Sequence, residues 1–180
     1  MVYIILGKGF EEIEAIAPCD ILRRGGVSVS FAAVGEQRIV VGSHGISVLA
    51  DILVSDILPS QDDTFVIPGG MGGVNSIKSD MLTMNLVASA AKSGASLAAI
   101  CAGPSVLAQL GLIEGKHITC HPGCKDMMGG AICEVSNPTL CDGTLITGRA
   151  AGSAIEFGLE LLSQLKGGDT AERIRTELVY

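Results

Sequence analysis

The chain has 180 residues, enough for one domain with a sizeable hydrophobic core and too few for two ordinary domains. Hydrophobic residues make up 48% of it and charged residues 17%, which argues against a disordered chain. The 19 acidic and 12 basic side chains give a formal net charge of −7, so nucleic acid and anionic membranes are poor partners. Without a secretory leader or a long apolar stretch, we expect a cytoplasmic protein whose six cysteines are mostly thiols.

Short apolar runs alternate with helical patterns along the chain. The apolar runs predict strands over residues 2–6, 27–34, 64–67 and 96–100. Apolar residues at helical spacing predict helices over residues 11–24, 80–93, 102–110, 150–166 and 170–177. Two hairpins are expected, over residues 38–49 and 140–147. Strands that alternate with helices indicate a mostly parallel sheet with helices on both faces, and so one α/β domain spanning residues 1–180.

Cys101 is the strongest candidate for a reactive side chain. It directly follows a predicted strand and precedes the small residues Ala102 and Gly103, where a helix is expected to begin. In such an abrupt turn the apex residue has a strained backbone, and its side chain is lifted clear of the sheet. Main-chain N–H groups at a helix start favour an anion, so we expect an acidic thiol. The alternative is a cysteine buried as a small hydrophobic residue.

Glu14 interrupts an otherwise apolar stretch of the first predicted helix. Glu11 and Glu12 suit the first turn of that helix, where the helix dipole favours acids, but Glu14 comes later. If Glu14 faces the interior, burial should raise its pKa and keep it protonated near neutral pH as a hydrogen-bond donor. The alternative is an acid on a solvated helix face.

Two further segments could complete a site at the carboxyl ends of the strands. His121 could act as a general base, orient a thiolate, or be a structural histidine. The glycine-rich segment 69–73 either supplies main-chain N–H groups as an oxyanion hole near Cys101 or forms a flexible turn. No dinucleotide or phosphate-binding fingerprint occurs, and the other cysteines lack the paired spacing of a zinc knuckle, so we expect neither cofactor nor metal.

Four short segments together carry a resemblance to a known family. They are KGFEEIE at 8–14, VIPGG at 66–70, AAICAGP at 98–104 and TCHP at 119–122. In order and spacing they resemble the ThiJ/PfpI superfamily, in the branch of the Parkinson-associated protein deglycase (DJ-one). The resemblance extends from Val2 to about Lys166, and the cysteine turn is its most specific motif.

The resemblance implies a flavodoxin-like three-layer sandwich that forms a homodimer. It implies Cys101 as the reactive thiolate, Glu14 as the protonated acid bound to it and His121 as the nearby histidine. Gly70 and Ala102 would supply main-chain N–H groups. The family's activities need no cofactor: a glyoxalase activity that converts methylglyoxal to lactate, deglycation of early glycation adducts and, in some members, oxidative-stress sensing or chaperoning.

Several positions depart from the family pattern. Peptidase relatives carry a histidine after the nucleophile where this chain has Ala102, so we expect no protease activity. Relatives have a second cysteine near the dimer interface where this chain has Leu49. An arginine of their anion pocket is replaced by His44, although Arg24 is retained, so the pocket should bind anions more weakly and with pH dependence. Glutamine amidotransfer would need a histidine after His121, and none exists.

The leading hypothesis is a cysteine-dependent, cofactor-free enzyme acting on reactive aldehydes or glycated substrates. Cys101 would add to the carbonyl carbon, and Glu14 or His121 would move a proton between neighbouring carbons. The alternative is a non-catalytic sensor of oxidative stress or a redox-regulated chaperone, in which a partner reads the oxidation of Cys101.

Overall fold

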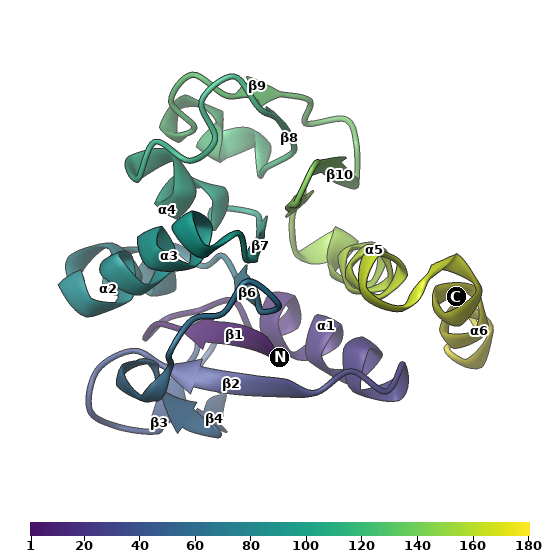
Figure 1. Cartoon of the computed structure of the whole chain (residues 1–180), viewed down its shortest axis with the longest axis horizontal. Helices are drawn as coiled ribbons and strands as arrows, with labels where there is room; N and C mark the ends of the chain where they lie inside the picture. Colours follow the sequence, from purple (N-terminus) through teal and green to yellow (C-terminus); the bar gives the residue numbers. More distant parts are fainter.

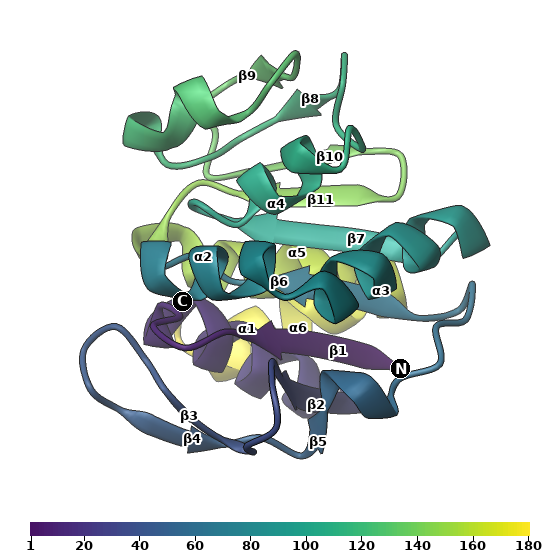
Figure 2. The same cartoon turned by 90° about the vertical axis from the view of Figure 1, so that its left-hand side faces the viewer.

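A seven-stranded sheet runs through the middle of the molecule. The structure is a computed structural model that describes all 180 residues. Neighbouring strands are parallel except for one antiparallel hairpin at the edge, in the order β10-β11-β7-β6-β1-β2-β5 (Figure 2). The strands are β1 (Val2–Leu6), β2 (Val29–Ala33), β5 (Ile52–Leu53), β6 (Thr64–Ile67), β7 (Ser96–Ile100), β10 (Thr139–Asp142) and β11 (Leu145–Gly148).

Helices cover both faces of this sheet (Figure 1). One layer consists of α1 (Glu12–Arg24), α5 (Ala154–Lys166) and α6 (Gly168–Glu177). The other consists of α2 (Met71–Ser79), α3 (Met81–Ser93) and α4 (Pro104–Gln109). This arrangement confirms the predicted three-layer α/β fold. None of these helices has both the length and the apolar character that a bilayer crossing requires.

The apolar strands contribute to two cores at once. In β1, Ile4 faces the core shared with Phe157 of α5, whereas the next residue, Ile5, faces the core shared with Val74 of α2 and Val87 of α3. Successive side chains of a strand point to opposite faces, so a strand between two helical layers must be apolar at every position. This explains the uninterrupted apolar runs that predict the central strands.

Two small two-stranded sheets and three short 3₁₀ helices extend the main sheet. The strands are β3 (Ile39–Val41) with β4 (Ser47–Leu49), and β8 (His117–Ile118) with β9 (Ile132–Cys133). The 3₁₀ helices are η1 (Val54–Asp56), η2 (Pro122–Met127) and η3 (Ala151–Ser153). The antiparallel β3–β4 pair and the β10–β11 pair confirm the two expected hairpins.

The structure differs from the sequence prediction at two helices. The sequence predicts a loop over 69–73, but α2 begins at Met71, inside that segment. Glycines are poor helix formers, yet a side chain at Gly73 would come within 2.7 Å of the main chain of Phe10, so close packing requires a glycine there. The predicted helix over 102–110 is shorter, because the turn continues to Gly103 and α4 starts at Pro104.

Candidate active site

Cys101 occupies a strained turn between β7 and α4. Its φ of 65° is in the left-handed region, which only one other non-glycine residue of the chain adopts. The main chain is anchored on both sides: the N–H of Cys101 donates to the carbonyl of Gly148 at 2.9 Å, and its carbonyl accepts from the N–H of His121 at 3.1 Å. A residue held in this conformation stores about 1 kcal/mol or more. The structure thus confirms the strained turn that the sequence predicts.

Glu14 is completely buried, which confirms the interior position over the solvated one. Its Oε2 accepts a hydrogen bond from the N–H of Gly69 at 2.7 Å, while Oε1 has no hydrogen-bond partner of standard geometry. Burial raises the pKa of Glu14 to about 7, although the neighbouring Cys101 thiol and the Gly69 N–H act in the opposite direction. Glu14 therefore exchanges a proton near neutral pH.

Glu14 and Cys101 approach each other across Gly69. A Cβ on this glycine would lie 2.6 Å from Oε2 of Glu14 and 2.8 Å from Cβ of Cys101, so only a residue without a side chain fits between them. Two neighbouring anions are unfavourable in a buried site, so Glu14 and Cys101 do not both lose their protons at neutral pH.

The thiol itself differs from the sequence prediction. Burial raises the pKa of Cys101, and the neighbouring Glu14 carboxylate raises it further. The N–H of Ala102 lowers this pKa, as expected for a donor at the turn, but its effect is smaller. The prediction of a thiol made acidic by its position alone is therefore wrong, because a buried carboxylate stands beside it. Cys101 must give its proton to an acceptor as it reacts.

Two main-chain groups are predicted to bind an oxyanion. Neither N–H, of Gly70 or of Ala102, donates to another main-chain group, and the N–H of Ala102 acts on the Cys101 sulfur. Gly70 directly precedes α2 and has a φ of 79°, and the nitrogen of Ala102 lies 3.0 Å from the Cβ position of Gly69. Both donors thus flank the Glu14–Cys101 pair. Their role as oxyanion donors stays a prediction.

His121 is attached to the site through its main chain rather than through its ring. The side chain is exposed, and Nδ1 accepts a hydrogen bond from the N–H of Gly123 at 3.0 Å. A neutral ring in this arrangement carries its proton on Nε2. No hydrogen bond joins the ring to Cys101 or Glu14. A catalytic role for His121 stays a prediction.

Arg24 and His44, the predicted anion pocket, do not meet within one chain. Arg24 is the last residue of α1, and its Nε pairs with Oδ2 of Asp20 at 2.7 Å. His44 lies in the β3–β4 turn, beside Glu11 and Glu12 at the other end of the same helix. An anion pocket built from both residues would need a second chain and stays a prediction.

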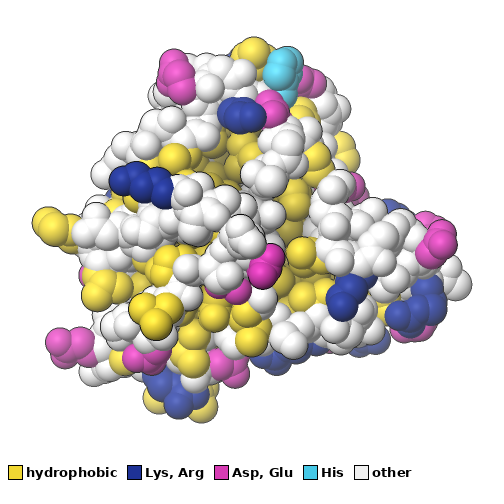
Figure 3. Space-filling view, viewed as in Figure 1, with side chains coloured by type: hydrophobic (Ala, Val, Ile, Leu, Met, Phe, Trp, Pro, Cys, Tyr) yellow, Lys and Arg dark blue, Asp and Glu magenta, His cyan; other side chains and the backbone are white.

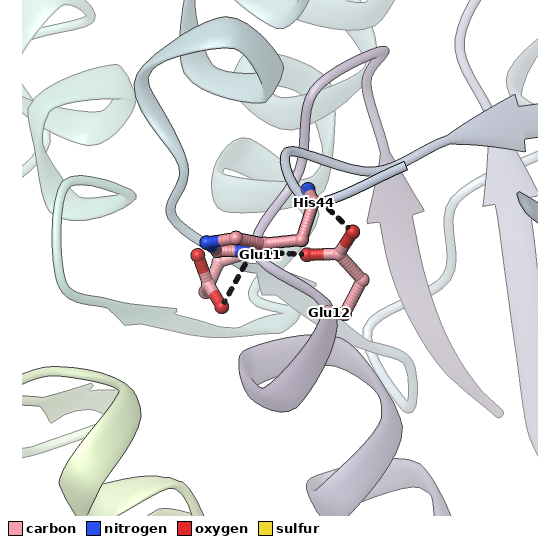
Figure 4. Close-up of side chains that lie close together, drawn as sticks. All are labelled: Glu11, Glu12 and His44. Atoms are coloured by element: carbon pink, nitrogen blue, oxygen red, sulfur yellow. Dashed lines mark hydrogen bonds and ion pairs between the residues drawn. The ribbon is translucent and has the colours of Figure 1, made fainter. Parts of the chain in front are cut away.

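Glu12 is only 5% exposed, and its role could not be predicted from its position in the first turn of the helix. The imidazole of His44 lies between two carboxylates, with Nδ1 3.0 Å from Oε2 of Glu12 and 3.6 Å from Oε1 of Glu11 (Figure 4). The main-chain N–H of His44 also donates to Oε1 of Glu12 at 2.8 Å. Although burial opposes it, hydrogen bonds from the side chain and main chain of His44 lower the pKa of Glu12 to about 2. The same partner raises the pKa of His44.

This cluster of Glu11, Glu12 and His44 is also the group most suited to a metal ion. Its donor atoms all lie within 4.8 Å of one another. In the structure they are already used to join the β3–β4 turn to the start of α1, and Oγ of Ser43 donates to the same carboxylates. In the sequence, only the histidine in the turn of a predicted hairpin pointed to this cluster.

The surface shows no extended basic region on the face drawn in Figure 3, where Lys and Arg side chains are scattered among Asp and Glu.

A hollow of about 430 Å³ lies between α5, α6 and β10, and its lining includes Glu156, Glu160 and Arg175 but not Cys101. The candidate catalytic residues Cys101 and Glu14 therefore do not line this hollow.

Comparisons with known proteins agree with this geometry. Residues 1–164 match the model of the DJ-1/PfpI family. The chain belongs to the DJ-1/PfpI family. It is similar to the protein dj-1beta of Drosophila melanogaster, with 34% identity over 98% of this chain and 95% of that protein.

Further members of this family are similar in sequence or structure. The chain is 33% identical to the glutathione-independent glyoxalase DJR-1.2 of Caenorhabditis elegans, over 87% of this chain and 83% of that protein. The crystal structure of a DJ-1 superfamily protein from Salmonella typhimurium superposes with a TM-score of 0.93 at 30% identity, covering 99% of this chain and 97% of the other. The flavodoxin-like fold of the family is therefore the fold of this chain.

Proposed function

We propose that this DJ-1/PfpI family member is a cysteine-dependent, cofactor-free enzyme for reactive carbonyls, with methylglyoxal or glycated groups as substrates. The observation that carries the proposal is the approach of the buried Glu14 carboxyl, with its pKa near 7, to the half-buried Cys101 across Gly69. A relative named as a glutathione-independent glyoxalase supports this substrate class. A carboxyl group with a pKa of about 7 is suited to give and take protons at neutral pH.

The first step would be addition of the Cys101 sulfur to the aldehyde carbon of methylglyoxal. Glu14, in its charged form, accepts the thiol proton while the carbon–sulfur bond forms, which compensates for the raised pKa of the thiol. The carbonyl oxygen becomes an oxyanion, for which the N–H groups of Gly70 and Ala102 would be the donors. The product of this step is a hemithioacetal.

The following steps need a proton carrier and water. A proton leaves the former aldehyde carbon and another is added to the neighbouring carbon, which converts the hemithioacetal into a thioester of lactate. Glu14 would carry this proton, and its pKa near 7 supports that role, with His121 as the other candidate. Hydrolysis of the thioester releases lactate and restores the Cys101 thiol, so the sequence of steps needs neither cofactor nor metal.

We also propose a cytoplasmic homodimer that works as one domain over residues 1–180. Six large apolar side chains of α1 and of the segment that contains the β3–β4 hairpin are exposed, an arrangement that a second copy would bury. They are Ile13, Ile16, Ile39, Val41, Ile46 and Leu49. All six cysteines are free thiols, which suits a reducing compartment. Size-exclusion chromatography with light scattering would measure the mass, and a monomer would contradict the dimer.

The test of the function is lactate formation from methylglyoxal without added thiol or metal. We expect turnover by the wild type, none above background by Cys101→Ser, and unchanged turnover by Cys141→Ser, which removes an exposed thiol on the edge strand β10. A wild type without turnover would favour the alternative, a sensor of oxidative stress or a redox-regulated chaperone that uses the same strained cysteine.

A further inference from the structure

Thr147 is the one polar side chain that the central strand β11 buries. Within this strand Ile146 belongs to the core beside α1 and α5, whereas Leu145 belongs to the core beside α2, α3 and α4. Side chains alternate along a strand, so Thr147 points to the same side as Leu145. It is completely buried there. A hydroxyl group in an apolar core is costly without partners, so the hydrogen bonds of Thr147 have to account for its presence.

The hydroxyl group of Thr147 has two main-chain partners. Its Oγ1 accepts a hydrogen bond from the N–H of Thr119 at 2.9 Å, and it donates to the carbonyl of Leu140 in β10 at 3.3 Å. Thr119 follows β8 directly, and it is also completely buried. Because both residues are buried, water cannot take over as the acceptor for the Thr119 N–H.

The hydrogen bond between Thr119 and Thr147 closes a ring around the reactive turn. Gly148, the residue after Thr147, accepts from the N–H of Cys101 at 2.9 Å. The carbonyl of Cys101 accepts from the N–H of His121 at 3.1 Å, and His121 is two residues from Thr119. Three hydrogen bonds therefore join β11, the turn at Cys101 and the segment after β8 into one closed ring.

Only one of these three hydrogen bonds depends on a side chain. The bonds that Gly148 and His121 make with Cys101 join main-chain atoms, so a substitution does not remove them. The third bond uses Oγ1 of Thr147. The turn needs this support because Cys101 has a φ of 65°, a conformation that persists in a residue with a side chain only where its surroundings enforce it.

We propose that Thr147 is a positioning residue for the reactive cysteine. Its hydroxyl group fixes the segment that contains His121, and the main chain of His121 holds Cys101 in the left-handed turn beside Glu14. The side chain of Thr147 makes no hydrogen bond with Cys101 or Glu14, so it acts through the main chain. The inference rests on the proposed function for its effect on turnover, but not for its effect on the reactivity of the Cys101 thiol.

Thr147→Val removes the hydroxyl group and keeps the shape of the side chain. We expect kcat for lactate formation from methylglyoxal to fall about tenfold at an unchanged KM, because a small displacement of Cys101 from Glu14 slows the chemical step rather than binding. Thr147→Ser keeps the acceptor and should keep the wild-type kcat. Thr119→Val is the matched control, since it removes a buried hydroxyl group that donates to Asn137 and leaves the ring intact.

Alkylation of Cys101 by iodoacetamide gives a second readout, which needs no turnover. Its rate is measured against pH by mass spectrometry of the peptide that contains Cys101. In the wild type the rate should rise near pH 7, because the carboxyl group of Glu14, with a pKa of about 7, then accepts the thiol proton. In Thr147→Val the rise should move towards about pH 8.5, the ordinary pKa of a thiol. A loss of stability alone would lower the Tm and leave this profile unchanged.

Two outcomes would overturn the positioning role. One is a Thr147→Val variant with the kcat and the alkylation profile of the wild type. The other is an equal loss in Thr147→Val and Thr119→Val, because the hydroxyl group of the ring would then have no effect of its own. If Thr147→Val does not fold, Thr147→Ala and Thr119→Ala are compared in the same way.

The two readouts also separate this inference from the proposed function. A wild type without turnover, whose alkylation profile still changes in Thr147→Val, would reject the enzyme and support the positioning role. A wild type with turnover that Thr147→Val retains in full, with the same profile, would reject the positioning role and leave the enzyme intact.

Discussion

Two buried glutamates of α1, only two residues apart, have opposite protonation behaviour. Glu12 is 5% exposed and Glu14 is 0% exposed, so burial alone would make both weak acids. His44 donates to Glu12 through its side chain and its main chain, which lowers the pKa of Glu12 to about 2. Glu14 has one main-chain donor, Gly69, and a thiol neighbour, and its pKa rises to about 7.

The comparison shows that partners, rather than depth, decide what a buried acid does. Glu12 is kept charged and joins the β3–β4 turn to the helix, so it is a structural group. Glu14 is left with too few donors to hold a full charge, so it can give and take a proton beside Cys101. Replacing each acid by glutamine should therefore produce different defects.

The largest effect is expected on turnover. Glu14→Gln should lower lactate formation by about 10²-fold or more, because the amide cannot transfer a proton. The pKa of Cys101 should fall in this variant, since the neighbouring carboxylate that raises it is gone. Absorbance of the thiolate against pH, together with methylglyoxal turnover, checks both effects. Glu12→Gln is the matched control and should keep its turnover. Equal activity of Glu14→Gln and wild type would show that Glu14 does not transfer the proton and would leave His121 as the candidate.

The second effect is on stability against pH. The pKa of Glu12 is lowered by folding, so its stabilisation is present above about pH 4.5 and is lost as the pH falls towards 2. The pKa of Glu14 is raised, so stability is highest below about pH 4.5 and declines as the pH rises through 7. The two acids therefore change the unfolding free energy in opposite directions as the pH rises.

Urea unfolding of the wild type and the two glutamine variants, measured from about pH 2 to pH 8, separates these contributions. Glu12→Gln should remove much of the rise in stability on the acidic side. Glu14→Gln should remove much of the fall on the neutral side. Profiles that change in the same way in both variants would show that the two acids do not differ.

The third effect comes from the glycine beside each acid. A side chain at Gly69 would lie 2.6 Å from Oε2 of Glu14, and one at Gly42 would overlap the carboxylate of Glu12. Gly69→Ala should therefore displace Glu14 and lower turnover by about tenfold, because small displacements of reacting groups are costly. Gly42→Ala should lower stability by about 1–2 kcal/mol and keep turnover. Equal turnover of both alanine variants would contradict the placement of the active site around Gly69.

The smallest effect is expected at His44. Its pKa is raised by Glu12, so the ion pair is fully formed below about pH 6.5 and is lost as the pH rises through the folded-state pKa. His44→Ala should lower the Tm more at pH 6 than at pH 9, and less than Glu12→Ala does. His117→Ala, which removes an exposed histidine paired with Glu134 alone, is the control. A Tm loss that does not depend on pH would mean that His44 acts only through its main chain.

The sequence by itself predicts the features that depend on neighbouring residues. The strands β1, β6 and β7 follow from apolar runs, since both faces of a central strand are buried. The strained turn at Cys101 follows from a strand that ends directly at small residues. Glu14 stands out because a carboxyl group is unexpected in an apolar helix stretch that packs on the core. Each of these signals lies within a few positions of the chain.

Only the tertiary structure decides what depends on residues far apart. α2 forms despite its glycines because Gly73 must pack against Phe10, more than sixty positions earlier. Glu12 meets the N–H of His44 from 32 positions away, and Glu14 meets Gly69 from 55 positions away. A pKa is set by burial and by donors within a few ångströms, whatever their separation in the chain. That is why the sequence can point to Glu14 and Cys101 but cannot tell that Glu12 is held charged and the Cys101 thiol is held protonated.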